Sequence, residues 1–308
     1  MPAVSVIIVN YNSEKYLPTF TLSLKGQTFQ DLEIVIVDNA SSDDSLAKLK
    51  GHFPQARFIL NQDNLGYCRA VNQAITNSSG KYVLTLNFDL VLEPDFIKQM
   101  VLAIESDPRI GSVSGKLYRS QNGEKTEVID TAGHQMTRAR IIKNRGQSQE
   151  REYIFGVSGA AALYRRDMLE DIKYKEEYLD EDLIAGLDDV DVDWRAQLYG
   201  WRCLFVPEAV AYHVRGAAQK PSSRRWRFLN YRNRYLTIIK NDDPLNFWLD
   251  LPFILVTEIG LFFSMLIDLQ VPAVIYSVLS LLPKFLDKRK VAQSKAKVSR
   301  NFIRQWFK

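Results

Sequence analysis

Short apolar runs alternate with amphipathic stretches along the first hundred residues. Residues 4–9 are a continuous β-branched run, and residues 33–37 and 82–86 repeat this pattern, with a shorter run at 57–60. Such runs are typical of strands that are buried on both faces of a parallel sheet. The stretches between them have helical spacing, over residues 14–25, 45–52 and 66–75. The pattern therefore predicts an α/β fold, with a parallel sheet covered by helices on both faces.

The pattern becomes less regular in the middle of the chain. Residues 110–165 are rich in strand-forming side chains, but residues 120–127 are polar enough to predict a loop. An acidic stretch over residues 180–193 leads into a predicted helix. Two short strands are expected after that helix, at residues 203–206 and 209–212.

The last quarter of the chain combines an apolar stretch with a basic one. Residues 244–286 are strongly apolar, but prolines and acids interrupt them before any charge-free run reaches the ~18 residues of a spanning helix. In-plane or re-entrant amphipathic helices are therefore predicted. Residues 284–308 carry nine Lys or Arg and one acid, Asp287. A basic tail beside an apolar stretch indicates attraction to an anionic lipid surface in preference to nucleic acid.

Composition adds little to this organisation. The chain has 308 residues, 46% hydrophobic and 25% charged, which is long enough to bury a core without disulfides. Its two cysteines, Cys68 and Cys203, have no metal or redox spacing and suit a reducing compartment. The first residues lack the features of a signal peptide, so a cytoplasmic body is expected.

Polar side chains follow the predicted strands at the edge of the sheet where ligands bind. Tyr11 follows the first strand, Asp38 the second, and Asn87 and Asp89 the fourth. Tyr11 can stack on a nucleobase, and the Asp38 carboxylate can accept hydrogen bonds from a base or a ribose. Asp89 offers the oxygen ligand that Mg²⁺ or Mn²⁺ prefers beside a diphosphate. Each position also fits an ordinary strand-end turn.

The acidic stretch and the late histidine offer a second kind of chemistry. Asp188 and Asp189 begin a predicted helix, where acids cap the helix and complement its dipole. One of them can instead act as a general base toward an acceptor hydroxyl, and their spacing does not decide which. His213 follows an apolar run, so it is either structural or a metal ligand if Asp89 lies nearby.

Residues 214–240 are basic and contain no acidic residue. Arginine pairs with phosphate through parallel hydrogen bonds, so this stretch predicts a nucleic-acid or lipid-diphosphate partner. A solvated helix face is the alternative, although such faces usually mix both signs of charge. The candidate phosphate ligands are Arg224, Arg225 and Arg232.

Taken together, these segments resemble glycosyltransferase family 2, and within it a bacterial rhamnosyltransferase-like branch. The resemblance runs from Val4 to about Leu236 and rests on eight segments in a fixed order. It implies a GT-A type nucleotide-diphospho-sugar transferase fold, a Rossmann-like, mostly parallel sheet flanked by helices. The matching segments are VSVIIVNYNSEKYL, VDNASSDDS, NLGYCRAVN, LNFDL with EPDF, FGVSGAAALYRRDML, LDEDLIAGLDDVDVDWRAQLYGWR, FVPEAVAYHVRG and NYRNRYL.

The resemblance also implies roles for particular residues. Asp189 matches the catalytic base, with Asp188 beside it, and Asp89 and His213 match ligands of a Mg²⁺ or Mn²⁺ ion. The acceptor side matches Ser158, Gly159 and Ala160, and the donor side matches Tyr11, Asp38, Asn39, Asn64, Gly66, Arg69, Asn72 and Asn87. The chain departs from the family in three places, because Asn87 replaces an acid, Asp188 replaces a glutamate, and residues 179–187 lack an aromatic pair.

The resemblance implies a catalytic domain over residues 1–240, and the apolar and basic composition of the rest predicts a membrane-associating helical region over residues 241–308. Residues 1–110 would bind the nucleotide sugar, and residues 111–240 would hold the acceptor and the base. The expected activity is inverting transfer from dTDP-rhamnose or a UDP-sugar to a polyprenyl-diphosphate-linked or polysaccharide acceptor in bacterial cell-surface glycan synthesis. The expected place is the cytoplasmic face of the membrane, bound peripherally or monotopically. The alternatives are a nucleotidyltransferase for sugar phosphates and a non-catalytic membrane or nucleic-acid binding protein.

Overall fold

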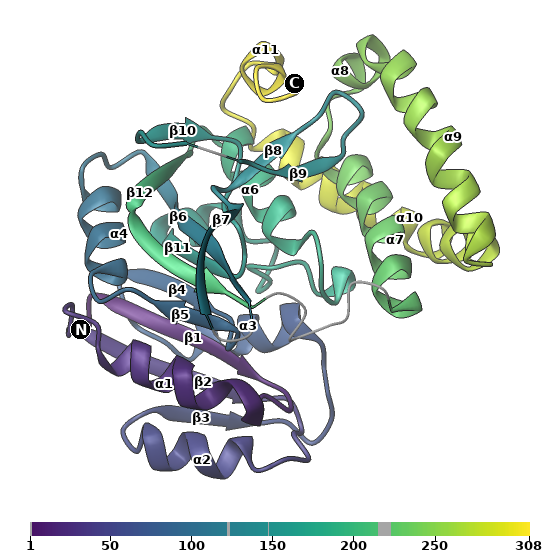
Figure 1. The fold of residues 1–308 in the computed structure, drawn as a ribbon. Helices are drawn as coiled ribbons and strands as arrows, with labels where there is room; N and C mark the ends of the chain where they lie inside the picture. Colours follow the sequence, from purple (N-terminus) through teal and green to yellow (C-terminus); the bar gives the residue numbers. More distant parts are fainter. Residues whose placement is uncertain (1, 122–123, 147, 215–222) are drawn as a thin grey trace.

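The computed structural model describes residues 2–121, 124–146, 148–214 and 223–308. Its first half is a layer of four parallel strands in the order β3-β2-β1-β4 (Figure 1). These strands are β1 (Val4–Asn10), β2 (Leu32–Asp38), β3 (Arg57–Leu60) and β4 (Tyr82–Leu86). The connections between them are η1 (Glu14–Tyr16), α1 (Leu17–Lys25), α2 (Ser45–His52) and α3 (Tyr67–Thr76). The predicted strand and helix order of this half is confirmed.

The apolar runs are continuous because the sheet is covered on both faces. Alternate residues of β1 point to opposite faces. Ile7 packs into the cluster that contains α3, whereas Val6 and Ile8 pack into the cluster that contains α1. Neither face is left to solvent, which is why no polar residue except Ser5 interrupts residues 4–9.

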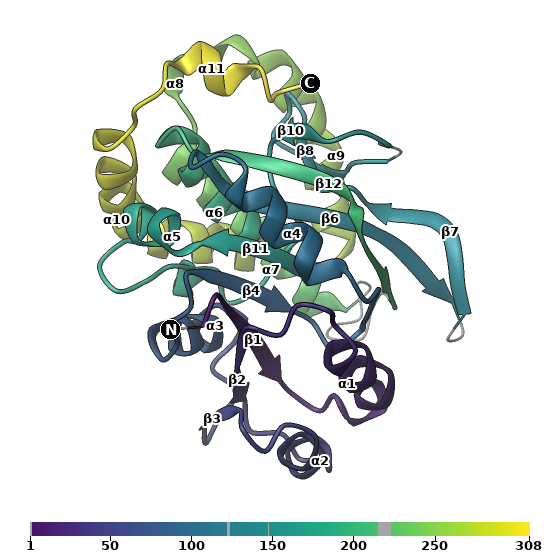
Figure 2. The ribbon, with the colours of Figure 1, turned by 90° about the vertical axis from the view of Figure 1, so that its left-hand side faces the viewer.

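The second half of the chain extends this sheet with strands of both directions. Within the described residues the sheet has ten strands, and β11 (Ala161–Arg165) pairs antiparallel with both β4 and β6 (Ile110–Gln121). Beyond β6 lie β12 (Arg202–His213) and β10 (Glu152–Ile154), while β5 (Leu90–Leu92) pairs with β12. Figure 2 shows α4 (Phe96–Glu105) lying across β6, β11 and β12. The opposite face carries α5 (Arg166–Ile172), η2 (Glu181–Leu183) and α6 (Asp188–Leu198).

Two predictions for this half are wrong. Residues 120–127 are not simply a loop, because β6 and β7 (Glu124–Thr131) pair as an antiparallel hairpin out to Gln121 and Glu124. A hairpin with one solvated face can be polar, which hid it in the pattern. The two short strands after α6 are the single strand β12, whose register against β6 shifts between Val206 and Val210. Pro207 lies in that shift and has no amide hydrogen to donate to a ladder.

A small ribbon stands apart from the main sheet. It consists of β8 (His134–Met136) and β9 (Ile142–Asn144), which pair antiparallel. Its backbone is tied to neighbouring segments, because the His134 amide donates to the Gly156 carbonyl at 2.8 Å. The Arg138 amide likewise donates to the Lys308 carbonyl at 3.0 Å. The ribbon therefore bridges the sheet and the last residues of the chain.

The C-terminal region is helical, and α8, α9 and α11 lie at the end of the molecule opposite β3 and α2 (Figures 1 and 2). Its helices are α7 (Arg224–Asn241), α8 (Pro244–Leu249), α9 (Leu251–Ile267), α10 (Val271–Ser294) and α11 (Arg300–Arg304). Among the described helices, none is by itself long and apolar enough to cross a membrane; α9 and α10 meet that test only together, bent by 116°. Pro283 lies inside α10 and does not end the helix.

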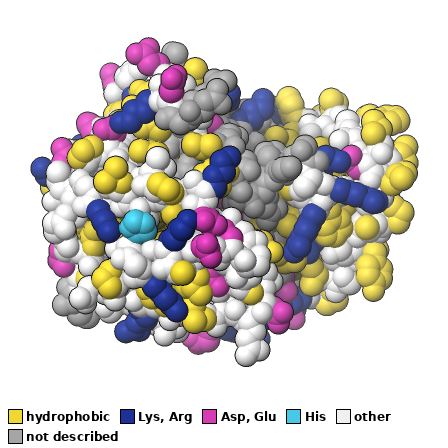
Figure 3. Space-filling view, turned by 60° about the horizontal axis from the view of Figure 1, so that its bottom comes forward, with side chains coloured by type: hydrophobic (Ala, Val, Ile, Leu, Met, Phe, Trp, Pro, Cys, Tyr) yellow, Lys and Arg dark blue, Asp and Glu magenta, His cyan; other side chains and the backbone are white. Residues whose placement is uncertain are grey.

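Apolar side chains on α9 are largely exposed. Val256 is 73% exposed, Ile259 60%, Phe263 57% and Ile267 82%. On the face drawn in Figure 3, hydrophobic side chains gather on the right-hand part of the molecule, with Lys and Arg side chains close beside them. By contrast, the far part of α10 and α11 packs into the body, where Phe285, Ile303 and Phe307 are buried.

The basic tail is paired with acids of the body to a degree that its composition did not indicate. Lys288 is buried and bonds to Asp180 and, at 2.6 Å, to Asp182. Lys240 of α7 donates to Asp180 at 2.7 Å and to Asp191 of α6 at 2.9 Å. Burial favours the neutral acid, but the two ammonium groups outweigh it and hold the pKa of Asp180 well below its usual range. We call Asp180, Asp191, Lys240 and Lys288 the buried ion cluster.

Replacing Lys288 by alanine should strongly destabilise the protein, because it leaves the Asp180 charge short of a buried partner. The expected loss at pH 7 is about 3–5 kcal/mol in urea unfolding. The pKa of Asp180 is lowered by folding, so its contribution is full above the unfolded pKa of about 3.9 and is lost as pH falls. The difference between variant and wild type should therefore shrink below about pH 4.

Lys290→Ala is the matched control, since Lys290 is exposed and pairs with the equally exposed Asp287 one helical turn away. Its cost should be at most about 0.5 kcal/mol. Equal losses for the two variants would contradict a structural role for the buried ion cluster.

Candidate active site

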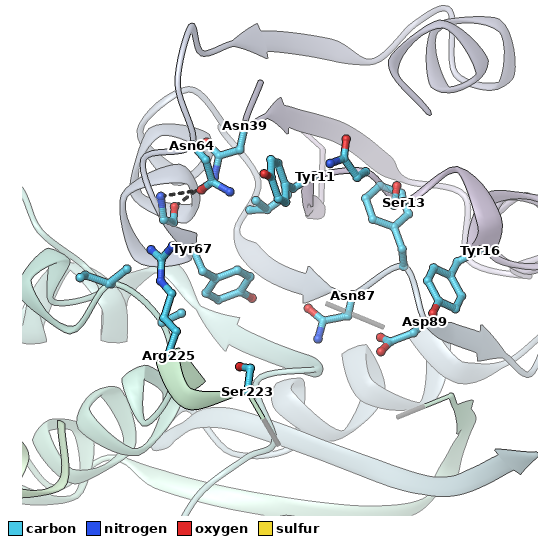
Figure 4. A pocket seen from close by; sticks show the side chains of 16 residues that line it. Tyr11, Ser13, Tyr16, Asn39, Asn64, Tyr67, Asn87, Asp89, Ser223 and Arg225 are labelled. Atoms are coloured by element: carbon cyan, nitrogen blue, oxygen red, sulfur yellow. Dashed lines mark hydrogen bonds between the residues drawn. The ribbon is translucent and has the colours of Figure 1, made fainter. Parts of the chain in front are cut away.

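A cavity of about 470 Å³ lies at the carboxyl ends of β1, β2 and β4. In Figure 4, Asn39 and Asn64 lie at one end, Asn87 and Asp89 at the other, and Tyr67 between them. Ser223 and Arg225 approach from the side of α7. The lining residues are Val9, Tyr11, Asn12, Ser13, Tyr16, Asn39, Asn64, Gly66, Tyr67, Asn87, Phe88, Asp89, Ile184, Ala185, Ser223 and Arg225.

The end of the cavity near β2 is built from amides. Asn39 donates to the Gly66 carbonyl at 3.2 Å and accepts from Asn61 at 2.8 Å, while Asn64 accepts from the Gly66 amide at 3.0 Å. Gly66 has a φ of +87°, and a Cβ there would lie 2.9 Å from Ile184 Cγ2, so both conformation and space favour glycine. Tyr11 is half exposed at this end, and its ring is free to stack on a flat ligand.

Asp38 lies beneath this end of the cavity and is not among its lining residues. It is only 3% exposed. Its carboxylate accepts from Asn10 Nδ2 at 2.6 Å and from the Ser41 amide at 3.1 Å. The structure thus gives Asp38 the strand-end turn that the sequence offered as its alternative, while its neighbour Asn39 faces the cavity.

The other end of the cavity contains a buried carboxylate. Asp89 is 5% exposed, and its Oδ1 atom has no hydrogen-bond partner among the described residues. The Asn87 amide N–H donates to the Ala160 carbonyl at 2.9 Å, which fixes the strand end against the segment before β11. His213, at the end of β12, places Nε2 3.3 Å from Asp89 Oδ2. The predicted proximity of Asp89 and His213 is present.

Asp130 of β7 holds the other side of the same imidazole, and sequence reasoning missed it. Its Oδ2 atom lies 2.9 Å from His213 Nδ1. Burial disfavours the charged imidazole, but hydrogen bonds with Asp130 and Asp89 outweigh it and raise the pKa of His213 to about 9. Asp130 lies in the stretch next to the predicted loop, and only the β6–β7 hairpin brings it to His213.

The acidic helix α6 docks on the segment before β11 through two carboxylates. Asp189 accepts from the Gly159 amide and Asp193 from the Val157 amide, each at 2.8 Å. Asp189 and Asp193 are four residues apart, so they share one face of the helix. A Cβ at Gly156 would lie 2.2 Å from Asp193 Oδ2, so the close approach requires glycine. Ser158, between the two amide donors, holds this turn by accepting from the Ala161 amide at 3.1 Å.

Asp188 and Asp189 differ in burial and partners. Asp188 accepts from the Gly186 amide at 2.7 Å and is 7% exposed. Burial and the neighbouring Asp189 charge raise the pKa of Asp188 to about 7. Tyr67 lines the cavity, and its burial and then the charges of Asp188 and Asp189 raise the pKa of its hydroxyl.

Several predicted ligands have structural partners instead of a place in the cavity. Asn72 is buried and bonds to the backbone of Tyr178 and Leu179. Arg232 is buried and donates to the carbonyls of Asp182 and Leu183. The Asn72 amide and the Arg232 guanidinium, which the sequence analysis assigned to donor and phosphate binding, therefore bond to the protein backbone instead.

Of the three remaining predicted arginine ligands, two contact other protein groups and one lines the cavity. Arg69 lies 3.8 Å from Glu181, and Arg224 donates to the Leu269 carbonyl at 3.1 Å, whereas Arg225 lines the cavity. Two other cations of the basic stretch, Arg215 and Lys220, lie outside the described residues.

Among the described residues, no three His, Cys, Asp or Glu side chains come together as an ion site.

Residues 5–173, more than half of the chain, match the family model for glycosyl transferase family 2. The chain belongs to glycosyl transferase family 2. Membership of this family favours sugar transfer over the nucleotidyltransferase and the non-catalytic alternatives.

Two curated relatives show how far the sequence similarity reaches. An uncharacterized glycosyltransferase of Haemophilus influenzae is 30% identical over 119 residues, 38% of this chain and 37% of that protein. The poly-β-1,6-N-acetyl-D-glucosamine synthase of Staphylococcus aureus is 23% identical over 224 residues, 69% of this chain and 50% of the synthase. The chain thus spans half or less of the length of these relatives.

Solved structures confirm the GT-A fold. GalNAc-T7, crystallised with UDP, GalNAc and Mn²⁺, aligns at a TM-score of 0.62 and 17% identity over 78% of this chain and 48% of that one. The mannosyltransferase PcManGT of Pyrobaculum calidifontis, in complex with GDP-Man and Mn²⁺, aligns at 0.58 and 18% over 95% and 87%. Residues 1–349 of S. aureus TarS align at 0.57 and 20% over 98% and 91%. At such identities the likeness establishes the fold alone.

Replacing Asp188 by asparagine should alter how stability depends on pH. The pKa of Asp188 is raised to about 7 by folding, so the folded state keeps a proton that the unfolded chain has already lost. Wild-type stability should therefore fall as pH rises from about 4 to 7, and Asp188→Asn should remove that component. Thermal unfolding from pH 4 to 8 should show the melting temperature of the variant rising relative to that of wild type as pH increases. Parallel curves for the two proteins would contradict this assignment.

Proposed function

We propose that this chain is a glycosyltransferase that takes a sugar from a nucleoside-diphosphate donor and inverts its anomeric centre. The observation that carries the proposal is the arrangement of the cavity, with an aromatic ring and amides at one end and the buried Asp89 carboxylate at the other. A nucleoside fits the first end, because Tyr11 can stack on its base and Asn39 and Asn64 present polar atoms to it. The diphosphate would then extend toward Asp89, and the sugar toward Tyr67 and the start of α6.

The residues near Asp89 suit a divalent cation. Asp89 Oδ1 is buried without a hydrogen-bond partner, and carboxylate oxygen and imidazole nitrogen both bind Mn²⁺ or Mg²⁺. We propose Asp89 and His213 as the protein ligands; His213 would bind as the neutral imidazole, so the cation displaces the Nε2 proton. Asp130 holds the His213 ring at Nδ1, as outer carboxylates do at metal sites. Bound there, the cation would offset negative charge on the departing diphosphate.

Asp189 is the proposed general base. The acceptor oxygen attacks the anomeric carbon as the bond from that carbon to the diphosphate breaks, and the diphosphate leaves with the electron pair. The acceptor proton passes to the Asp189 carboxylate. A single displacement from the opposite side inverts the anomeric centre. The Gly159 amide, which donates to Asp189 Oδ2, orients the carboxylate beside the segment Ser158–Gly159–Ala160 that we assign to the acceptor.

The donor and acceptor are proposed at the level of class. UDP and GDP-Man are bound to proteins of the same fold, which supports a nucleoside-diphosphate donor, and we keep dTDP-rhamnose and UDP-sugars as the first candidates. A synthase of a bacterial surface polysaccharide among the relatives supports an acceptor in cell-surface glycan synthesis. Arg225 lines the cavity and offers a cation to an acceptor or donor phosphate.

A membrane surface is the proposed location of the acceptor. The exposed apolar side chains of α9 lie along one helix, as in helices that rest in the plane of a lipid interface. An exposed cation lies near the end of that helix, because Arg224 donates to the Leu269 carbonyl just beyond Ile267. This arrangement supports peripheral or monotopic binding to the cytoplasmic face and a polyprenyl-diphosphate-linked acceptor.

The donor assignment can be tested by thermal stabilisation with sugar nucleotides, with and without MnCl₂. A donor of the right class should raise the melting temperature, more so with Mn²⁺, by mass action. Asp89→Asn should lose the Mn²⁺-dependent part. Asp189→Asn should keep the donor-induced rise but lose about 10²–10⁴-fold in transfer.

Asp31→Asn, at an exposed position of the N-terminal half, is the control and should behave as wild type. Near-normal transfer by Asp189→Asn would reject its role as base. An unchanged Mn²⁺ response in Asp89→Asn would reject the proposed ion site.

Membrane binding can be tested by sedimentation with phosphatidylglycerol vesicles. Ile259 and Phe263 are four residues apart on α9 and share one exposed face. Replacing both by aspartate should reduce bound protein about tenfold or more, because two apolar groups leave the interface and two like charges meet an anionic surface. Leu22→Asp is the matched control, since Leu22 is 75% exposed on α1 at the other end of the molecule.

Equal binding of the double variant and wild type would contradict membrane docking through α9. If the double variant instead converts a dimer to a monomer without changing vesicle binding, this face contacts a second copy of the chain.

A further inference from the structure

His134 lies beside Asp189 and has no role in the mechanism proposed above. The residue is 7% exposed, and its Nδ1 atom is buried without a hydrogen-bond partner among the described residues. That atom lies 3.9 Å from Asp189 Oδ2. A buried imidazole nitrogen without a partner normally costs free energy, so its position next to a functional carboxylate needs an explanation.

The backbone holds His134 firmly in this place. Thr131 Oγ1 accepts from the Gly133 amide at 3.1 Å and donates to the Gly133 carbonyl at 2.9 Å, which closes a tight turn before β8. Gly133 has a φ of +91°, and a Cβ there would lie 2.3 Å from Ile154 Cδ1. The His134 amide then donates to Gly156, so the ring is positioned by the same segment that Asp193 contacts. These constraints argue that the imidazole position is specified by the fold.

Asp189 has room for a second donor on the oxygen that faces His134. Its Oδ2 atom accepts from Gly159, and its Oδ1 atom accepts from the Val190 amide at 2.8 Å. An ionised carboxylate has about four acceptor positions, so Oδ2 can accept one more hydrogen bond. The present separation exceeds a hydrogen bond, but catalytic hydrogen bonds are often long before substrate binds. A rotation of either side chain would close it.

Resting on the proposed role of Asp189 as base, we propose that His134 is its positioning residue. In the tautomer with a proton on Nδ1, His134 donates to Asp189 Oδ2 beside Gly159, and the two donors fix the carboxylate plane. The other oxygen, Oδ1, is then oriented to take the acceptor proton. His134 keeps its own proton throughout and does not touch the substrate.

A purely structural histidine is the competing explanation, since buried histidines often fill space. The two explanations differ in whether the His134 ring forms a hydrogen bond with the Asp189 carboxylate and so affects its protonation. Other ionisable groups also face Asp189 and are held constant by leaving them in place, namely Asp188, Asp193, Tyr67 and Tyr164. A test must therefore change His134 alone and read out the protonation of the base.

The first experiment measures transfer by His134→Leu and His134→Asn across pH, with a donor identified by the stabilisation assay. His134→Leu should lower kcat about 10–100-fold with little change in the donor KM, because the base is misoriented while the donor site is intact. The acid limb of its kcat profile should move to higher pH, because a carboxylate without this donor takes up a proton more readily. Asparagine has an amide N–H near the position of Nδ1, so His134→Asn should restore most of kcat and the pH profile.

Gln135→Leu is the matched control, because Gln135 is the next residue of β8 and its side chain points to the opposite face. It should leave kcat and the pH profile unchanged. A His134→Leu enzyme that keeps the wild-type pH profile, or one that asparagine does not rescue, would overturn the proposal.

The second experiment does not need turnover. The chain has three histidines, His52, His134 and His213, so ¹⁵N-histidine labelling gives few imidazole signals to assign. Asp189→Asn should shift the His134 Nδ1 resonance in the donor complex and leave His52 unchanged. No response of His134 would overturn the proposal even if transfer is normal. If wild type transfers sugar from no donor, the proposed function fails, whereas the coupling of His134 to Asp189 is judged separately by these spectra.

Discussion

The buried ion cluster is the interaction on which the arrangement of the C-terminal half depends. It joins Asp180 before η2, Asp191 on α6, Lys240 on α7 and Lys288 on α10, and all four side chains are almost fully buried. Removing one member of such a cluster leaves the others uncompensated, so its members act together. Helices that are far apart in the sequence are therefore fixed to the acidic helix α6. The cluster therefore holds α7 and α10 against the body of the protein.

The start of α6 shows how this rigidity serves the site. The helix is held from one side by the ion cluster and from another by Asp189 and Asp193, which accept from backbone amides of the segment before β11. Backbone amides are good partners here because the segment is glycine-containing and approaches the helix closely. One helix thus carries both a carboxylate that orders the structure and the carboxylate we assign to proton transfer. Small shifts of α6 would disturb both.

The sequence predicted the N-terminal half well because its signal is local. Strands buried on both faces give unbroken apolar runs, and β3 and β4 begin and end where those runs do. The pairing of Asp89 with His213 also followed, but from a resemblance and not from spacing. Asp38 was placed at the correct strand end, yet its carboxylate is used by Asn10 and Ser41, which no pattern along the chain indicates.

The features that sequence reasoning missed are all contacts between distant segments. Asp130 reaches His213 only through a polar hairpin, and His134 reaches Asp189 only through a two-stranded ribbon. The basic stretch looked unpaired because its acids lie elsewhere, as with Arg234 and Glu258 or Lys240 and Asp180. Charge counted over a window cannot reveal partners that lie 24 to 60 residues away in the chain.

The packing of Phe307 has a consequence for how the protein matures. Its ring lies 5.8 Å from that of Trp194 of α6 between centroids, and the Arg140 guanidinium lies 4.0 Å from its centre. The family match ends at residue 173, yet the hydrophobic environment of α6 is closed by residues emerging more than a hundred positions later. During synthesis the N-terminal layer of parallel strands can assemble while α6 still lacks its cover. Ribosome-bound chains would thus hold a formed N-terminal layer before the acid that we assign to catalysis is in its final position.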